Sequence, residues 1–340
     1  MSKPFTVAKI GLYLGVPLIL GLGLSIANAD KSSTENIPVA LKANEEELFP
    51  ADLLSISETE AFSKYVLVVD KSKRTLAIYE REGAHIKKVE EWTADIGKNN
   101  GNKTKKDDHK TPEGIYFLEK RLNQPEIPFD LYGELAFTTN YPNFFDQLEG
   151  KTGHGIWLHA IPDSVPLTRG SRGCVVVRNE VIRKVADYIK LGETPILIFD
   201  QIEYISAAEH KRRRQEIAQY LEDWRLAWQS MDLDKYMSYY HEDFKAPGFN
   251  FKGWRRHKQN LKNIYSYINV HIYQPYILIH NDQLIVKALQ RYESNKHTDY
   301  GVKTLYARKV DGQYKIVREE WVPATDRLAS TTAPQTISTQ

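Results

Sequence analysis

The chain has 340 residues, 41% of them hydrophobic and 26% charged, which is enough for two globular domains with ordinary cores. Its formal net charge is +2, and the two lysines of the first 29 residues account for it, because the remainder has 44 basic and 44 acidic side chains. This balance gives no support for nucleic-acid binding. A single cysteine, Cys174, excludes an internal disulfide framework and a cysteine-rich zinc site, and no cofactor is expected.

The N-terminal residues have the pattern of a secretory signal peptide. Lys3 and Lys9 precede an apolar run, Ile10 to Ile26, and Ala27-Asn28-Ala29 matches the small-x-small cleavage pattern. We therefore expect residues 1–29 to be removed and the body to be periplasmic, with only a transient contact with the membrane. The alternative is an uncleaved anchor, because an apolar run of this length nearly spans a bilayer.

Residues 30–63 are polar and acidic, and they predict a linker. A dimerisation arm, and hence a homodimer, is the alternative. Beyond this segment, β-branched content and alternation predict strands over 65–70, 74–80 and 86–96.

A polar loop and an aromatic stretch follow. The lysines of residues 97–109 either meet substrate carboxylates or are simply solvated. A strand is expected over 114–122. Residues 123–153 are irregular and either wall a substrate groove or pack on the sheet; their aromatic residues include Tyr132, Phe137, Tyr141, Phe144 and Phe145.

One histidine and the cysteine carry the clearest chemistry. The run Ile156-Trp157-Leu158 leads to His159 on a predicted strand, and Cys174 follows 15 residues later, directly after Gly173. A base activates a thiol, and glycine lets the backbone turn tightly beside it. The pattern predicts a cysteine–histidine site for acyl transfer, against the alternative of a buried, inert cysteine. His154 is an odd number of residues from His159, so it faces the other side of the strand.

The segment after the cysteine completes a mostly β domain over residues 64–205. Buried-strand composition is found over 175–178 and 194–200, and the residues between them predict a helix over 180–190 with Asn179 as its N-cap.

A second domain, with a different pattern, is expected over 207–323. It has predicted helices over 209–231, 233–240 and 254–267 and long strands over 270–279, 283–292, 300–310 and 314–322. Asp311-Gly312 predicts a hairpin turn.

Two further segments of the C-terminal half are not expected to form a functional site. His241, Glu242 and Asp243 are adjacent at a predicted helix end, where they do not converge on one metal ion, so a solvated cap is favoured. Residues 324–340 predict a disordered tail.

Two motifs resemble the L,D-transpeptidase (YkuD-type) family, which remodels bacterial peptidoglycan. The first is His159 followed by Ser171-Arg172-Gly173-Cys174, and the second is the Thr-Pro-x-Gly-x-aromatic pattern within Lys110–Tyr116. The resemblance covers residues 65–199 and implies a β-sandwich catalytic domain. Two positions depart from the common motif: Ala160 replaces a glycine, and Val176 replaces an arginine.

The resemblance implies a role for each motif residue. Cys174 would be the nucleophile, His159 the general base, and the Ala160 carbonyl the group that orients the histidine. The backbone N–H groups of Gly173 and Cys174 would be the oxyanion donors. The substrate would be a peptidoglycan stem peptide, cut between meso-diaminopimelate and D-Ala. The substrate-binding candidates are Ser171, Arg172, Trp157, Arg169 and Arg178.

The C-terminal pattern is similar to the cone-shaped α+β fold of nuclear transport factor 2 (NTF2). The two domains together resemble the cell-shape L,D-carboxypeptidases of curved bacteria, which favours hydrolysis. Cross-link formation, attachment or release of a wall-linked lipoprotein, and a non-catalytic wall-binding scaffold are the alternatives. The second domain is expected to be a positioning or dimerisation module; the alternative is a glycan pocket that uses Trp254, Tyr265, Tyr273 or Tyr292.

Overall fold

The computed structural model describes residues 47–57, 59–83, 85–168 and 170–324. The predicted signal peptide, residues 30–46 of the predicted linker and nearly all of the predicted tail lie outside these ranges. Within the described residues, none of the helices has the length and apolar character needed to cross a membrane.

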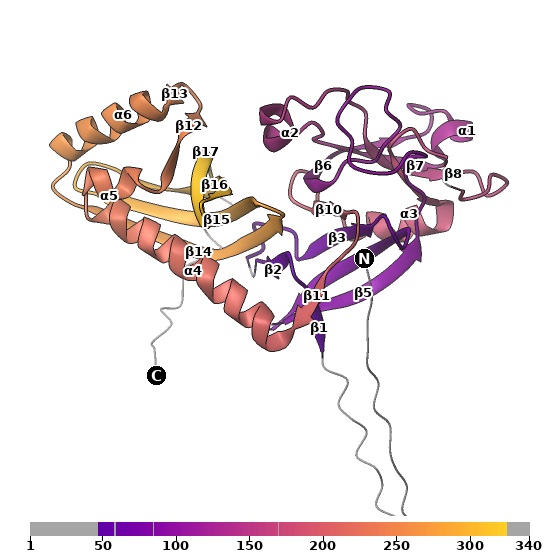
Figure 1. The fold of residues 1–340 in the computed structure, drawn as a ribbon, viewed down its shortest axis with the longest axis horizontal. Coiled ribbons are helices and arrows are strands. Elements are labelled where there is room, and N and C mark those ends of the chain that lie inside the picture. Colours follow the sequence, from indigo (N-terminus) through magenta and orange to yellow (C-terminus); the bar gives the residue numbers. More distant parts are fainter. Residues whose placement is uncertain (1–46, 58, 84, 169, 325–340) are drawn as a thin grey trace, which may run out of the picture. The chain divides into compact units, whose positions relative to one another are not determined.

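The first domain is built mainly from strands (Figure 1). Its short helices are α1 (Phe129–Tyr132), α2 (Phe144–Leu148) and α3 (Asn179–Ala186). Its strands are β3 (Tyr65–Asp70), β4 (Thr75–Glu82), β5 (His85–Thr93), β6 (Gly114–Asn123), β7 (Leu135–Thr139), β8 (Trp157–Ile161), β9 (Val175–Arg178) and β10 (Pro195–Phe199). They form one sheet in the order β5-β4-β3-β10-β6-β7-β8-β9.

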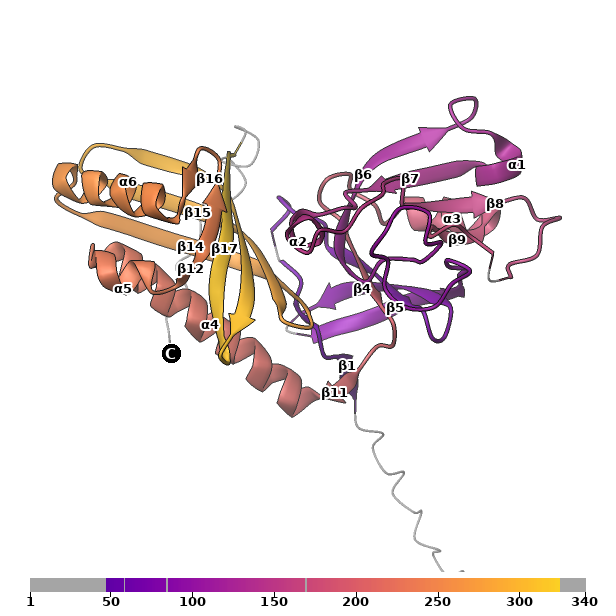
Figure 2. The same ribbon diagram turned by 45° about the horizontal axis from the view of Figure 1, so that its top comes forward.

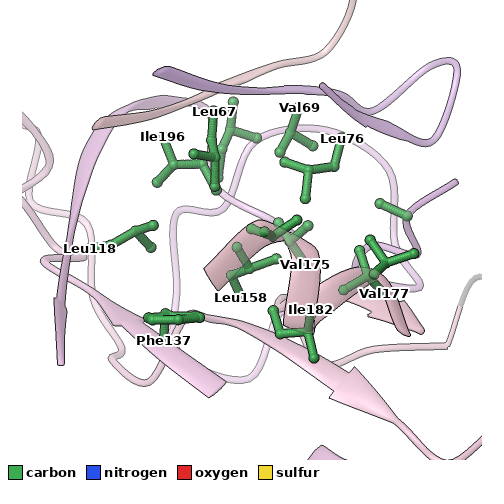
Figure 3. Packing of buried hydrophobic residues seen from close by; sticks show 14 of the residues in the cluster. Leu67, Val69, Leu76, Leu118, Phe137, Leu158, Val175, Val177, Ile182 and Ile196 are labelled. Carbon is green, nitrogen blue, oxygen red and sulfur yellow. The ribbon is translucent and has the colours of Figure 1, made fainter. Parts of the chain in front are cut away.

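Strand β6 makes this sheet turn back over its own core. Its first half pairs with β10 (Ile115 opposite Leu197), and its second half pairs with β7 (Leu122 opposite Ala136). Figure 3 shows side chains from the two parts of the sheet meeting in between. The labelled ones are all buried: Leu67, Val69, Leu76, Leu118, Phe137, Leu158, Val175, Val177, Ile182 and Ile196. The predicted mostly β catalytic domain is confirmed.

The second domain has helices and a long, mostly antiparallel sheet, as expected for an NTF2-like α+β fold. Its helices are α4 (Ala207–Gln229), α5 (Leu233–Met237) and α6 (Phe251–Ile264). Its strands are β11 (Tyr204–Ser206), β12 (Tyr240–Ala246), β13 (Phe249–Asn250), β14 (Ile268–His280), β15 (Gln283–Ser294), β16 (Thr298–Val310) and β17 (Gln313–Pro323). Helix α4 runs along β14 in both views (Figure 2), and its buried Leu221 and Trp224 pack in one cluster with Ile277 of β14.

Part of the predicted linker instead forms two strands, one in a separate two-stranded sheet and one at the edge of the second domain's sheet. Strand β1 (Leu48–Pro50) pairs with β11, and β2 (Leu53–Ser55) pairs with β14. Leu53 and Leu54 are fully buried, and they belong to two different hydrophobic clusters because successive strand residues face opposite sides. The linker prediction is therefore wrong for these strands, whose partners lie far away in the sequence.

Two further expectations need correction. Helix α3 begins at Asn179 with Arg178 as its N-cap, because the Asn179 side chain accepts from the Glu134 N–H and donates to the Ile161 carbonyl instead of capping. The helix ends at Ala186, before the predicted end at residue 190. Residues 241–243 lie in strand β12 rather than at a helix end. No cluster of three potential His, Cys, Asp or Glu metal ligands exists among the described residues.

The packing of α4 predicts that shortening a side chain destabilises the protein more at a buried position of this helix than at an exposed one. Leu221→Ala removes a buried side chain and should lower the free energy of unfolding by about 2–5 kcal/mol. Leu226→Ala, on the same helix at a site that is 43% exposed, should change it by less than about 0.5 kcal/mol. Urea denaturation followed by tryptophan fluorescence measures both, and equal effects would contradict the assigned α4 packing.

Candidate active site

Strands β8 and β9 bring the predicted nucleophile and base to one place. They run parallel, with Leu158 opposite Val175 and His159 opposite Val176. Cys174 directly precedes β9 and is partly buried, while His159 is 5% exposed. The two sequence signals therefore lie on adjacent strands of one sheet.

The loop before Cys174 is held by hydrogen bonds of Ser171. The Ser171 hydroxyl donates to the Cys174 carbonyl oxygen at 2.7 Å and accepts from the Gly173 N–H at 3.0 Å. The Gly173 N–H, expected to face the oxyanion, is therefore occupied in the structure. Ser171, a candidate for substrate binding, has its hydroxyl engaged within the loop.

The two sequence motifs meet at Gly173. This residue has φ of 127°, and a Cβ placed on it would lie 2.6 Å from the Lys110 carbonyl oxygen. Lys110 begins the second motif, whose Thr111 hydroxyl accepts from the Gly97 N–H at 2.8 Å. Gly97 in turn forms a parallel β-bridge with Ser171. A larger residue than glycine at position 173 would collide with the backbone of the other motif.

His159 is oriented by the carbonyl of the residue that follows it. Its Nδ1 lies 2.6 Å from the Ala160 oxygen, so Nδ1 carries the proton and Nε2 is the free base. Burial lowers the pKa of His159 to about 4, a shift that the bond to Ala160 partly opposes. Tyr132 of α1 packs edge-on against the imidazole with ring centroids 5.0 Å apart. At neutral pH the histidine is therefore uncharged.

The thiol is uncharged as well. Burial raises the pKa of Cys174 to about 11. A hydrogen bond from the backbone N–H of Trp157 and the positive charge of Lys103 offset only part of this rise. The sulfur donates to the Gly155 carbonyl oxygen at 3.5 Å. The resting site thus combines a neutral thiol with a neutral imidazole, which requires general-base activation at the moment of attack.

Cys174 opens onto a cleft of about 540 Å³. One wall is apolar and aromatic and includes Tyr132 and Trp157, whose ring centroids are 4.9 Å apart. Lysines of the predicted loop 97–109 line another part, together with Arg172 from the cysteine loop. The cleft therefore suits an elongated substrate with both apolar and anionic groups.

An ion pair between Arg74 and Asp95, which the sequence did not predict, supports the loop before Cys174. Asp95 exchanges both backbone hydrogen bonds with Val176, at 2.6 and 2.8 Å, and its carboxylate accepts from the Gly170 N–H at 3.1 Å. The same carboxylate pairs with Arg74 at 2.6 Å, and Arg74 also donates to the Leu167 carbonyl. In the sequence, the only indication of this ion pair is that the acidic Asp95 stands between the apolar residues Ala94 and Ile96. The structure shows that Asp95 is buried.

The other predicted site residues fall in different places. Trp157 and Arg172 line the cleft. Arg178 donates to the Val165 carbonyl at 2.5 Å and so holds a loop, and Arg169 lies outside the described residues. His154 also lines the cleft and is exposed, rather than packed behind the strand.

The aromatic residues proposed as pocket walls are mostly core. In the first domain, Tyr132 lines the cleft, whereas Phe137, Tyr141 and Phe145 are buried and Phe144 packs on a core. In the second domain, all four candidates pack in or against hydrophobic clusters: Trp254, Tyr265, Tyr273 and Tyr292.

The neutral resting pair predicts an unusual pH profile for alkylation. Because burial raises the Cys174 pKa to about 11, the rate with iodoacetamide should be low at pH 7 and rise about tenfold per pH unit toward that value. The urea-unfolded chain is the control, and its profile should level off at about pH 9. The single cysteine makes the mass shift site-specific. A plateau of fast reaction between pH 5 and 8 would show a preformed thiolate and contradict the neutral pair.

Comparison with known proteins agrees with this geometry. Residues 64–198 match the family model described as the L,D-transpeptidase catalytic domain (YkuD), and residues 216–320 match the one described as the Cds6 C-terminal NTF2-like domain. No sequence among the curated proteins matches the chain.

Solved structures resemble both domains together. Bd1075 of Bdellovibrio bacteriovorus is 66% identical, with a TM-score of 0.78, and the match covers 82% of this chain and 100% of that one. The helical cell shape determining protein Pgp2 of Campylobacter jejuni is 26% identical, with a TM-score of 0.62, over 79% of this chain and 95% of that one. The chain therefore belongs to the L,D-transpeptidase (YkuD) family and carries a C-terminal NTF2-like domain.

Proposed function

We propose that the protein is an exported cysteine enzyme that removes the terminal D-Ala from tetrapeptide stems of peptidoglycan, as an L,D-carboxypeptidase. The observation that carries this proposal is the placement of Cys174 in a cleft beside β8, with His159 on that strand fixed in the tautomer that leaves Nε2 free. A cysteine and a correctly oriented base are the elements that acyl transfer requires. The substrate class follows from membership of a family that acts on the cell wall.

The mechanism begins with a proton transfer. His159 Nε2 takes the proton of Cys174 as the sulfur attacks the carbonyl of meso-diaminopimelate in its bond to D-Ala. Because Ser171 occupies the Gly173 N–H, we assign the oxyanion to the N–H of Cys174. The imidazolium then protonates the leaving amine, D-Ala departs, and a thioester remains.

Water completes the reaction in this proposal. His159, neutral again, takes a proton from a water molecule that attacks the thioester. The C–S bond then breaks, the tripeptide is released, and the imidazolium returns the proton to the Cys174 sulfur. The likeness to Pgp2, a protein named as determining helical cell shape, supports trimming of the wall over its reinforcement. A role in cell shape is proposed on the same ground.

The proposal predicts the product formed from a disaccharide tetrapeptide. The protein should convert it to the disaccharide tripeptide and free D-Ala, as mass spectrometry would show. Cys174→Ala should abolish this conversion, and His159→Ala should slow it by about a hundredfold or more, because it removes the general base.

A surface variant, Arg121→Gln, serves as the control and should act as the wild type does; Arg121 is exposed on β6. If a cross-linked dimer formed instead of the tripeptide, the protein would be a transpeptidase rather than a carboxypeptidase. Conversion that survives Cys174→Ala would refute the cysteine mechanism.

The pH dependence of this activity follows from the state of the base. His159 must be neutral to accept the proton, and its lowered pKa keeps it neutral until the pH falls through about 4. The acid limb of kcat/KM should therefore lie near that pH, well below the ordinary imidazole value of about 6.5. Steady-state rates between pH 3.5 and 8 measure it, and a limb at 6.5 or above would count against the buried, neutral histidine.

A further inference from the structure

The catalytic cleft contains more positive than negative charge. Three cations, Lys103, Lys106 and Arg172, line it together with one carboxylate, Asp107. Lys103 already forms an ion pair within the protein, because its side chain is only 4% exposed and its Nζ lies 2.8 Å from an oxygen of Asp108. The charge balance of the cleft therefore depends on the other two cations.

Arg172 and Lys106 have charged groups without a partner in the described part of the chain. Arg172 is exposed, and neither a hydrogen bond nor an ion pair of its guanidinium occurs with the described residues. Lys106 is also exposed; its backbone N–H bonds the Thr152 hydroxyl, but its ammonium has no such bond to a described residue. Two uncompensated cations beside the nucleophile indicate an anionic group on the substrate.

The proposed substrate carries such a group close to the bond that breaks. In a tetrapeptide stem, the bond that breaks joins the last residue, so the terminal carboxyl carbon lies about 2.5 Å beyond the scissile nitrogen. Arg172 precedes the nucleophile by two residues on the same loop, and both residues line the same cleft. A guanidinium presents two parallel N–H groups that match a carboxylate, which a point charge does not.

We propose that Arg172, with Lys106 beside it, binds the α-carboxylate of the terminal D-Ala and restricts the enzyme to stems that end in a free carboxylate. This inference rests on the proposed function and adds its specificity determinant. Stems whose fourth residue is extended or amidated lack the anion at this position, so they should be poor substrates.

Two substrates that differ only in this anion test the inference. They are a disaccharide tetrapeptide with terminal D-Ala and the same molecule with terminal D-alaninamide. The wild type should favour the acid by about tenfold to a hundredfold in kcat/KM, as expected for hydrogen bonds to a charged group. Release of the fourth residue, measured by chromatography with mass detection, gives both values.

The variants separate binding from loop structure. Arg172→Gln should reduce kcat/KM for the acid by about tenfold to a hundredfold and for the amide much less, so that the preference disappears. Arg172→Lys should restore part of the preference, because it keeps the charge but loses the paired N–H groups. Lys106→Gln should give a smaller selective loss, and Arg121→Gln should keep the full preference.

Two results would overturn the inference while leaving the proposed function intact. One is equal cleavage of acid and amide by the wild type. The other is an equal loss on both substrates in Arg172→Gln, which would assign Arg172 to loop structure alone. If the wild type cleaved neither substrate, the proposed function itself would fail, and this inference with it.

Discussion

The parallel pairing of β8 with β9 brings the proposed nucleophile and base of the candidate site together. With Leu158 opposite Val175, the start of β9 lies beside the start of β8, which brings Cys174 next to Trp157 and close to His159. A shift of one residue would turn the histidine to the other face of the sheet. The backbone hydrogen bonds between Asp95 and Val176 hold β9 from its other edge, so β9 is held in position by hydrogen bonds on both edges.

Burial then determines the chemistry that this placement permits. It pushes the pKa of the thiol up and that of the imidazole down, so neither group is charged before substrate binds. Such a pair differs from a preformed thiolate–imidazolium pair, because the proton moves only when the carbonyl is attacked. Arg172 and Lys106 therefore carry much of the positive charge that the cleft offers to an anionic substrate.

The sequence predicted the parts of this arrangement that depend on local pattern. Alternation and β-branched runs located most strands, and two short motifs located Cys174 and His159. The parts that depend on distant partners escaped it. Strand β2 looked like linker because its partner, β14, lies more than 200 residues away, and the bond between Ser171 and Gly173 depends on a loop conformation that residue types do not reveal.

The most direct test of the central claim is the detection of an acyl-enzyme on Cys174. The protein would be mixed with disaccharide tetrapeptide, quenched in acid at a series of times, and analysed by intact mass spectrometry and peptide mapping. The account predicts a transient adduct with the mass of the disaccharide-tripeptide acyl group, located on Cys174 and absent from Cys174→Ala. Turnover without an adduct at any time, or an adduct on a different residue, would contradict it.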